Sequence, residues 1–135
     1  MRPIKFRYVY RPYGTNKIII VHYTLEQLEE LTISKSKYIA DPSYELISRD
    51  QLTGRYDKDG KEIYEGDILN IPSTGYDVKE YNHRVIWNEY TLTYEGITKS
   101  GRVYELWYDE ELEVIGNIYE NPEYKRDFFK DTKGE

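Results

Sequence analysis

Three carboxylates stand close together between residues 62 and 67, and they are the side chains of this chain best suited to acid–base chemistry: Glu62, Glu65 and Asp67. Two carboxylates act as general acid and general base only when both line one cleft and their pKa values are pushed apart. A chain with 25 acidic residues supplies such neighbours by chance. Because no nucleophile paired with a base accompanies them, we predict that the protein is not an enzyme.

The segment Asp57-Lys58-Asp59-Gly60 begins like a calcium loop. A calcium loop of the EF-hand type needs oxygen ligands at its positions 1, 3, 5 and 12, with glycine at position 6. Counted from Asp57, positions 5, 6 and 12 hold Lys61, Glu62 and Ile68, so the match fails. Asp-Gly is a frequent dipeptide in hairpins, and we therefore predict a tight turn at residues 57–60.

The rest of the chain offers little cofactor chemistry. It has no cysteine, which excludes disulfides, thiolate zinc sites and cysteine nucleophiles. Its two histidines, His22 and His83, have no partners at metal-ligand spacing. No glycine-rich loop has the spacing that cradles phosphate, and no serine stands in a nucleophile elbow. We predict neither a metal nor a cofactor.

Residues that form turns and bends gather in two segments, 51–69 and 114–123. Gly66 is predicted to supply a bend, because glycine tolerates positive φ, and Asp67 to hold that bend by accepting backbone N–H groups. An asparagine side chain at a turn commonly hydrogen-bonds to the nearby backbone, which is the role predicted for Asn117 and Asn121. The alternative is that these two side chains contact a ligand. A structural role is predicted for Gly54, Asp57, Gly60, Gly66, Asp67, Gly116, Asn117, Asn121 and Pro122.

The composition indicates one β-rich protein of modest size. The chain has 135 residues, of which 39% are hydrophobic and 16 are tyrosine, a residue that fits pleated, half-buried strands. The longest apolar run, 18–21, is far too short for a membrane span, and the N-terminus lacks a secretion signal. With the absence of cysteine, this favours a cytoplasmic location and no membrane partner.

The first part of the chain is predicted to form a hairpin and a short helix. Apolar and polar residues alternate from Ile4 to Tyr10, a turn follows at 11–16, and a second strand returns over 17–23. Thr24 and Gln27 have the spacing of a capping box, which predicts a helix over 25–31.

The remaining elements are predicted to be short strands. Candidate strands cover 38–40 and 44–49, separated by a turn at 41–43, and further strands are predicted at 66–71, 84–88, 91–94, 102–108 and 112–119. Short strands at this spacing are typical of a barrel or a sandwich. Residues 124–135 form a tail of mixed charge.

Segments 4–7 (IKFR), 51–69 (QLTGRYDKDGKEIYEGDIL) and 114–123 (VIGNIYENPE) together resemble the YopX family of phage and prophage proteins. The resemblance implies a small SH3-like β-barrel built from the C-terminal two thirds of the chain. The predicted fold is therefore mainly β (β-rich α+β), with three parts: residues 1–50 as an N-terminal β-hairpin plus one short helix, 51–123 as the barrel core, and 124–135 as the tail. The family implies no activity.

Charge is distributed unevenly along the chain. Residues 1–22 carry five basic side chains and no acid, whereas 103–124 carry seven acids and no base. The first strand is expected to pair with that acidic segment inside the fold. Aromatic rings alternate with Arg7 and Arg11, as in platforms for single-stranded nucleic acid. With a sequence pI near 5.1, the protein lacks the overall positive potential of nucleic-acid-binding proteins. A nucleic-acid role linked to phage replication is therefore kept as the alternative hypothesis.

The favoured hypothesis is a phage or prophage accessory protein that binds another protein without catalysis. Tyrosine suits interfaces, since its ring offers apolar area and its hydroxyl a polar tip. The partner would be a host or phage protein that the sequence does not identify, and exposed strand edges leave a homo-oligomer open. The candidate interaction residues are Arg7, Arg11, Glu62, Tyr64 and Glu65.

Overall fold

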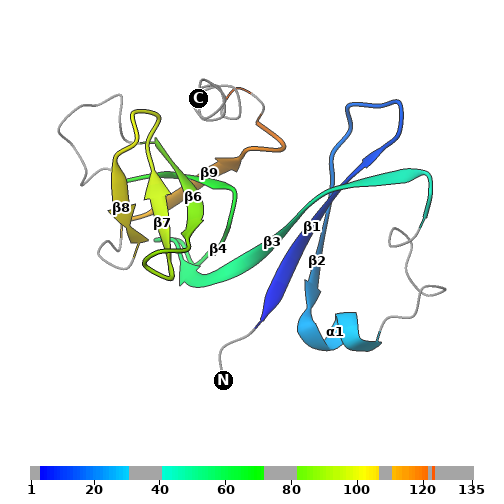
Figure 1. The fold of residues 1–135 in the computed structure, drawn as a ribbon, viewed down its shortest axis with the longest axis horizontal. Coiled ribbons are helices and arrows are strands. Elements are labelled where there is room, and N and C mark those ends of the chain that lie inside the picture. Colours follow the sequence, from blue (N-terminus) through cyan, green and yellow to red (C-terminus); the bar gives the residue numbers. More distant parts are fainter. Residues whose placement is uncertain (1–3, 31–40, 72–81, 107–110, 122, 124–135) are drawn as a thin grey trace. The chain divides into compact units, whose positions relative to one another are not determined.

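The computed structural model describes residues 4–30, 41–71, 82–106, 111–121 and 123 (Figure 1). The chain forms two compact units, residues 1–52 and 53–135. The strand predicted at 38–40, the tail at 124–135 and Pro122 lie outside the described residues.

The first unit is built on an antiparallel hairpin. Strands β1 (Lys5–Pro12) and β2 (Ile19–Thr24) pair over six residues, from Lys5 opposite Thr24 to Tyr10 opposite Ile19. Strand β3 (Tyr44–Tyr56) pairs with the other side of β1, with a bulge between Val9 and Tyr10. The hairpin predicted from period-two alternation is confirmed.

Helix α1 (Leu25–Glu30) follows β2 without a loop, and its start is held by the predicted capping box. The Gln27 backbone N–H donates to the Thr24 hydroxyl at 3.1 Å, and the Thr24 N–H donates to the Gln27 side-chain oxygen at 2.8 Å. Two N–H groups that no helical carbonyl accepts are thereby satisfied. The helix is confirmed, and its last described residue is one position before the predicted end.

Strand β3 is longer than predicted and runs past residue 49 to Tyr56. Asp50 interrupts the apolar pattern that defines a buried strand face, yet its side chain is buried and paired with Arg7. The strand also contains Gly54, whose φ is +85°. Beyond the predicted turn, β3 pairs with the short strand β4 (Glu62–Tyr64), so the sheet order is β2-β1-β3-β4.

The second unit holds a five-stranded antiparallel sheet in the order β8-β7-β6-β5-β9. Its strands are β5 (Asp67–Asn70), β6 (Asn82–Asn88), β7 (Thr93–Ile97), β8 (Val103–Glu105) and β9 (Glu113–Asn117). The mainly β class with one short helix is confirmed. A closed SH3-like barrel is not found: over the described ranges no ladder joins β8 to β9, and β4 pairs with β3 in the other sheet. Closure would require hydrogen bonds between those two outer strands.

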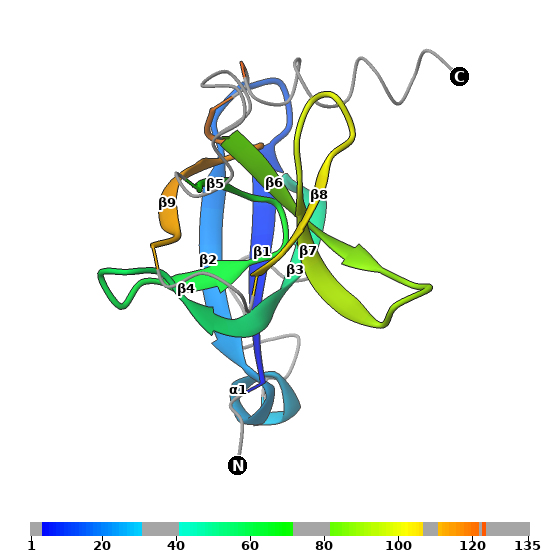
Figure 2. The same ribbon diagram turned by 90° about the vertical axis from the view of Figure 1, so that its left-hand side faces the viewer.

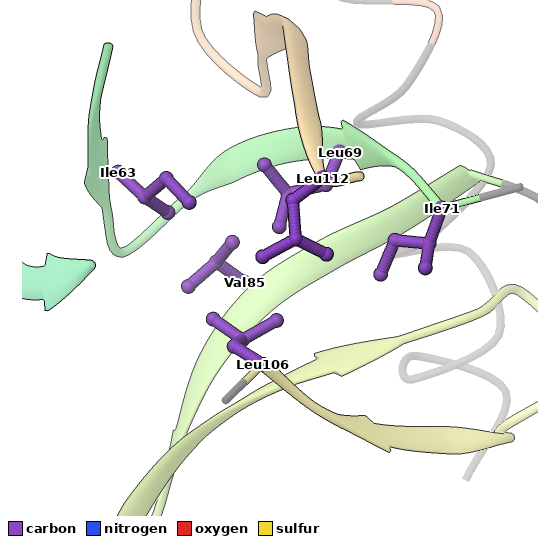
Figure 3. Close-up of a cluster of buried hydrophobic side chains, with 6 residues drawn as sticks. All are labelled: Ile63, Leu69, Ile71, Val85, Leu106 and Leu112. Carbon is purple, nitrogen blue, oxygen red and sulfur yellow. The ribbon is translucent and has the colours of Figure 1, made fainter. Parts of the chain in front are cut away.

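The core of the second unit gathers aliphatic side chains from its strands and loops. Figure 3 shows the six buried members of this cluster: Ile63, Leu69, Ile71, Val85, Leu106 and Leu112. Tyr94, Tyr104 and Val114 pack against them. Strand β5 carries its buried residues as a continuous run, which is typical of a strand buried on both faces.

Candidate functional site

Asp57 anchors the turn between β3 and β4. Its buried carboxylate accepts the backbone N–H groups of Asp59 and Lys61 at Oδ1, both at 2.9 Å, and that of Val114 at Oδ2, at 3.1 Å. Burial would raise the pKa of Asp57, but the three N–H donors and the nearby charge of Lys61 outweigh it and lower the pKa. The carboxylate is therefore an ionised structural anchor, and the segment forms the turn predicted in place of a calcium loop.

Gly66 and Asp67 form the bend between β4 and β5. Gly66 has a φ of +89°; its N–H donates to the Val85 carbonyl at 3.0 Å, and its carbonyl accepts the Ile118 N–H at 3.1 Å. Asp67 is buried and its Oδ2 accepts the Tyr64 N–H at 2.8 Å. The bend thus binds β6 on one side and the end of β9 on the other.

Asn117 and Asn121 organise the exit from β9. The Asn117 Oδ1 accepts the N–H groups of Tyr119 and Glu120 at 3.0 and 2.8 Å, and its Nδ2 donates to the Glu120 carboxylate at 2.8 Å. Asn121 accepts the Asn117 N–H through Oδ1 and donates its own N–H to the Asn117 carbonyl, both at 3.1 Å. Both polar groups of the Asn117 amide and the amide oxygen of Asn121 are used locally, which supports a structural role over contact with a ligand.

Strand pairing completes the junction between segments 51–69 and 114–123. Asp67 lies opposite Asn117 in the β5–β9 ladder, and Ile68 lies opposite Gly116. The register then shifts, so that Leu69 faces Val114 and Ile115 has no opposite residue. Residues of the two segments that carry the sequence resemblance therefore pair with one another.

The three acids considered for acid–base chemistry lie in strand β4, in the turn that follows it and at the start of β5. Asp67 is committed to a backbone N–H group, while Glu62 and Glu65 are half-buried in β4 and the turn that follows it. Tyr64, between them, is buried, so its ring is not accessible to a partner. In the part of the chain that the structure describes, no three His, Asp or Glu side chains gather as a metal-binding group.

Arg7 and Arg11, the predicted interaction cations, form ion pairs across the β1–β3 ladder. Arg7 is 5% exposed and donates through Nε and Nη2 to Oδ2 of Asp50, itself 3% exposed, at 3.2 and 3.0 Å. Ser48 donates to the other carboxylate oxygen at 2.7 Å. Arg11 pairs with Glu45 at 2.7 Å near the surface. These ion pairs join β1 to β3, whereas the sequence predicted pairing with the acidic segment 103–124.

The tyrosines of the first hairpin pack on one another. The Tyr8 ring meets Tyr23 edge-on at 5.2 Å between centroids and lies 6.2 Å from Tyr10. Burial, with further contributions from Tyr23 and Tyr8, raises the pKa of Tyr10 to about 12. Because Tyr10 is buried, its ring is not available for stacking on a nucleic-acid base. At this position the ring is part of the hydrophobic core.

Among the described residues of the second unit, the most exposed apolar side chains lie at the β6–β7 turn, which we term the hairpin tip, residues 88–92. Tyr90 is 98% exposed and Leu92 is 69% exposed. Residues 89–92 connect the strands, because Asn88 lies opposite Thr93. In Figure 2 the two strands run together to a turn that extends beyond the other strands of their sheet.

Sequence patterns alone did not indicate the hairpin tip, because the strands predicted at 84–88 and 91–94 leave only residues 89 and 90 between them. The available signal was an aromatic and an aliphatic residue inside a turn that contains neither glycine nor proline. Turns usually contain glycine, proline, asparagine, aspartate or serine, so apolar residues there are informative.

The two units differ in charge. The first, residues 1–52, has 8 basic and 6 acidic residues, a net charge of +2. The second, residues 53–135, has 11 basic and 19 acidic residues, a net charge of −8. Among the described residues there is no helix with the length and apolarity that crossing a lipid bilayer requires.

Comparison with known proteins identifies the family. A family model described as YopX protein matches residues 10–124. No curated protein matches. The crystal structure of protein EF1440 from Enterococcus faecalis is similar at 20% sequence identity and a TM-score of 0.44, covering 90% of this chain and 96% of that one. Since the family match spans most of the chain, including the whole of segments 51–69 and 114–123, the chain belongs to the YopX protein family.

Proposed function

We propose that the protein is a non-catalytic accessory protein of a phage or prophage that acts in the bacterial cytoplasm by binding another protein. The phage role rests on what the YopX resemblance implies. The binding role rests on one observation, the exposed apolar side chains at the hairpin tip. Clustered exposed apolar side chains mark interaction sites more often than scattered single ones do.

The absence of catalysis is supported by how the acids are used. Asp57 and Asp67 each accept backbone N–H groups, which a general acid or base would have to give up during turnover. The segments that carry the family resemblance thus have structural roles in the second unit, and we assign binding to its surface.

Nucleic-acid binding is the second candidate, supported by the exposed residue Arg49, whose Cζ lies 6.0 Å from the centroid of the Tyr8 ring. It is less well supported than protein binding, because Arg7 is buried against Asp50 and the chain carries a net charge of −6.

Affinity capture tests the proposal. The tagged full chain is incubated with lysate of host bacteria taken before and during phage growth, with and without nuclease, and bound protein is quantified. We expect a protein that is retained after nuclease treatment in an amount comparable with the bait. Capture of nothing, or of material lost entirely on nuclease treatment, would reject protein binding; the second of these results would support the nucleic-acid candidate.

A further inference from the structure

We propose that the hairpin tip is the docking element of this protein, and that Tyr90 and Leu92 insert into an apolar pocket with a basic rim on a partner protein. This inference rests on the proposed function and adds to it the site and the chemistry of the partner. It follows from the exposure of the tip, its backbone conformation and its charge.

The tip is held in one shape although its side chains face water. The Asn88 side-chain oxygen accepts the N–H groups of Tyr90 and Thr91 at 2.9 and 3.3 Å, and the Asn88 carbonyl accepts the Leu92 N–H at 2.8 Å. The Thr91 and Thr93 hydroxyls lie 2.9 Å apart. These bonds fix the turn through its backbone and leave the Tyr90 ring unconstrained by the fold.

Leu92 has a backbone conformation that its residue type disfavours. Its φ is +57°, and among the described residues it is the one non-glycine residue with positive φ. Glycine or asparagine is usual at such positions, because a branched side chain crowds the backbone there. Leu92 is mostly exposed, so little burial compensates for the strain. Backbone strain that no packing contact in the folded protein offsets is typical of functional sites.

The base of the tip is a rigid support. The rings of Trp87 and Tyr94, which lie opposite each other in the β6–β7 ladder, meet edge-on at 4.9 Å between centroids. The Asn88 Nδ2 donates to Oε1 of the buried Glu95 at 2.7 Å. A preformed turn on such a support loses little conformational entropy on binding, and tyrosine is among the residues that dominate binding energy at interfaces.

The charge of the tip and its unit indicates the chemistry of the partner. Glu89 is the one charged side chain within residues 88–92 at neutral pH, and the second unit carries a net charge of −8. A partner with lysine or arginine around its pocket would be attracted to this unit, and an acidic rim would be repelled. The same charge disfavours nucleic acid as the occupant.

Two variants separate docking from folding. Leu92→Asn replaces the apolar side chain with one that tolerates positive φ, so the midpoint of thermal unfolding should rise by roughly 2–4 °C. Tyr90→Ser removes the exposed ring without loss of a contact within the fold. Each full-chain variant is used as bait in nuclease-treated lysate, and we expect at least tenfold less of the wild-type partner. Tyr13→Ser, which removes an exposed tyrosine from the first unit, is the matched control and should capture as wild type does.

The outcomes distinguish this inference from the proposed function. If wild type captures a protein and both tip variants capture it equally well, the docking role of the tip is wrong while the proposed function stands. If wild type captures nothing, both fail. Glu89→Lys should lower capture and weaken its salt dependence; an increase would contradict the basic rim. A dimer of wild type in solution that Tyr90→Ser makes monomeric would assign the tip to a second copy and overturn the choice of partner.

Discussion

The Asp57 carboxylate accepts the backbone N–H of Val114 at 3.1 Å and so joins two segments that lie 57 residues apart in the chain. The same carboxylate closes its own turn through two further N–H groups. One side chain thus shapes the β3–β4 turn and fastens that turn to β9. Asp57 therefore has a structural role within the segment that resembles the YopX family.

Replacing Asp57 tests this structural role. Asp57→Asn leaves one side-chain oxygen for three N–H donors, and its amide N–H groups would face the N–H of Val114 or of the turn. We expect a loss of about 2 kcal/mol in the free energy of unfolding, measured by urea denaturation. Asp59→Asn, an exposed change in the same turn, should cost less than about 0.5 kcal/mol. Equal losses for the two variants would show that Asp57 does not anchor the junction.

The acid stability of the protein should depend on Asp57. Its pKa in the folded state is lowered from the ordinary value of 3.8, so folding favours the ionised form. The stabilisation is fully present above that ordinary value and is lost as the pH falls through the lowered folded-state pKa. The free energy of unfolding should therefore decline from about pH 5 downwards, and Asp57→Asn should flatten this decline. An unchanged acid profile in the variant would contradict the assignment.

The two ion pairs of β1 should contribute very differently to stability. Arg7→Ala leaves the buried carboxylate of Asp50 without its guanidinium, and we expect a loss of about 3–5 kcal/mol in the free energy of unfolding. Arg11→Ala removes a pair near the surface and should cost about 1 kcal/mol or less. Denaturant unfolding of both variants measures the contrast, and similar losses would argue against a buried Arg7.

Two glycines should respond to substitution for different reasons. A Cβ at Gly96 would lie 2.9 Å from the Cβ of buried His83, so Gly96→Ala should cost about 1–3 kcal/mol through overpacking. Gly60 faces open space but has a φ of +84°, so Gly60→Asn should be tolerated better than Gly60→Ala. Gly96→Asn should be worse than Gly96→Ala. Thermal unfolding of the four variants checks this order, and a tolerated Gly96→Asn would refute the packing argument.

Local features of the fold could be predicted from the sequence because their partners are a few residues apart. The Thr24–Gln27 capping box, the Asp57 turn and the bend at Gly66 each depend on residue types within a short stretch. The alternation of apolar and polar residues along β1 likewise identifies a single strand. Such local patterns predict the elements but not the elements with which they pair or pack.

Contacts between residues far apart in the chain could not be predicted from such local patterns. Arg7 was expected to meet the acidic segment near the C-terminus, yet its partner Asp50 lies directly opposite it in the β1–β3 ladder. Strand register decides this contact, and register depends on the whole sheet. The exposed ring of Tyr90 and the positive φ of Leu92 were hidden for a similar reason, since exposure and backbone conformation at a turn depend on how its flanking strands pair.

Site-specific photocrosslinking tests the central claim most directly. A photoreactive phenylalanine analogue replaces Tyr90, or Tyr13 as the control, in the full chain expressed in host bacteria during phage growth, and the cells are irradiated. The account predicts one dominant adduct with another protein from position 90, and none from position 13. An adduct of equal yield from both positions, or none from position 90 while the protein still captures its partner, would contradict docking through the hairpin tip.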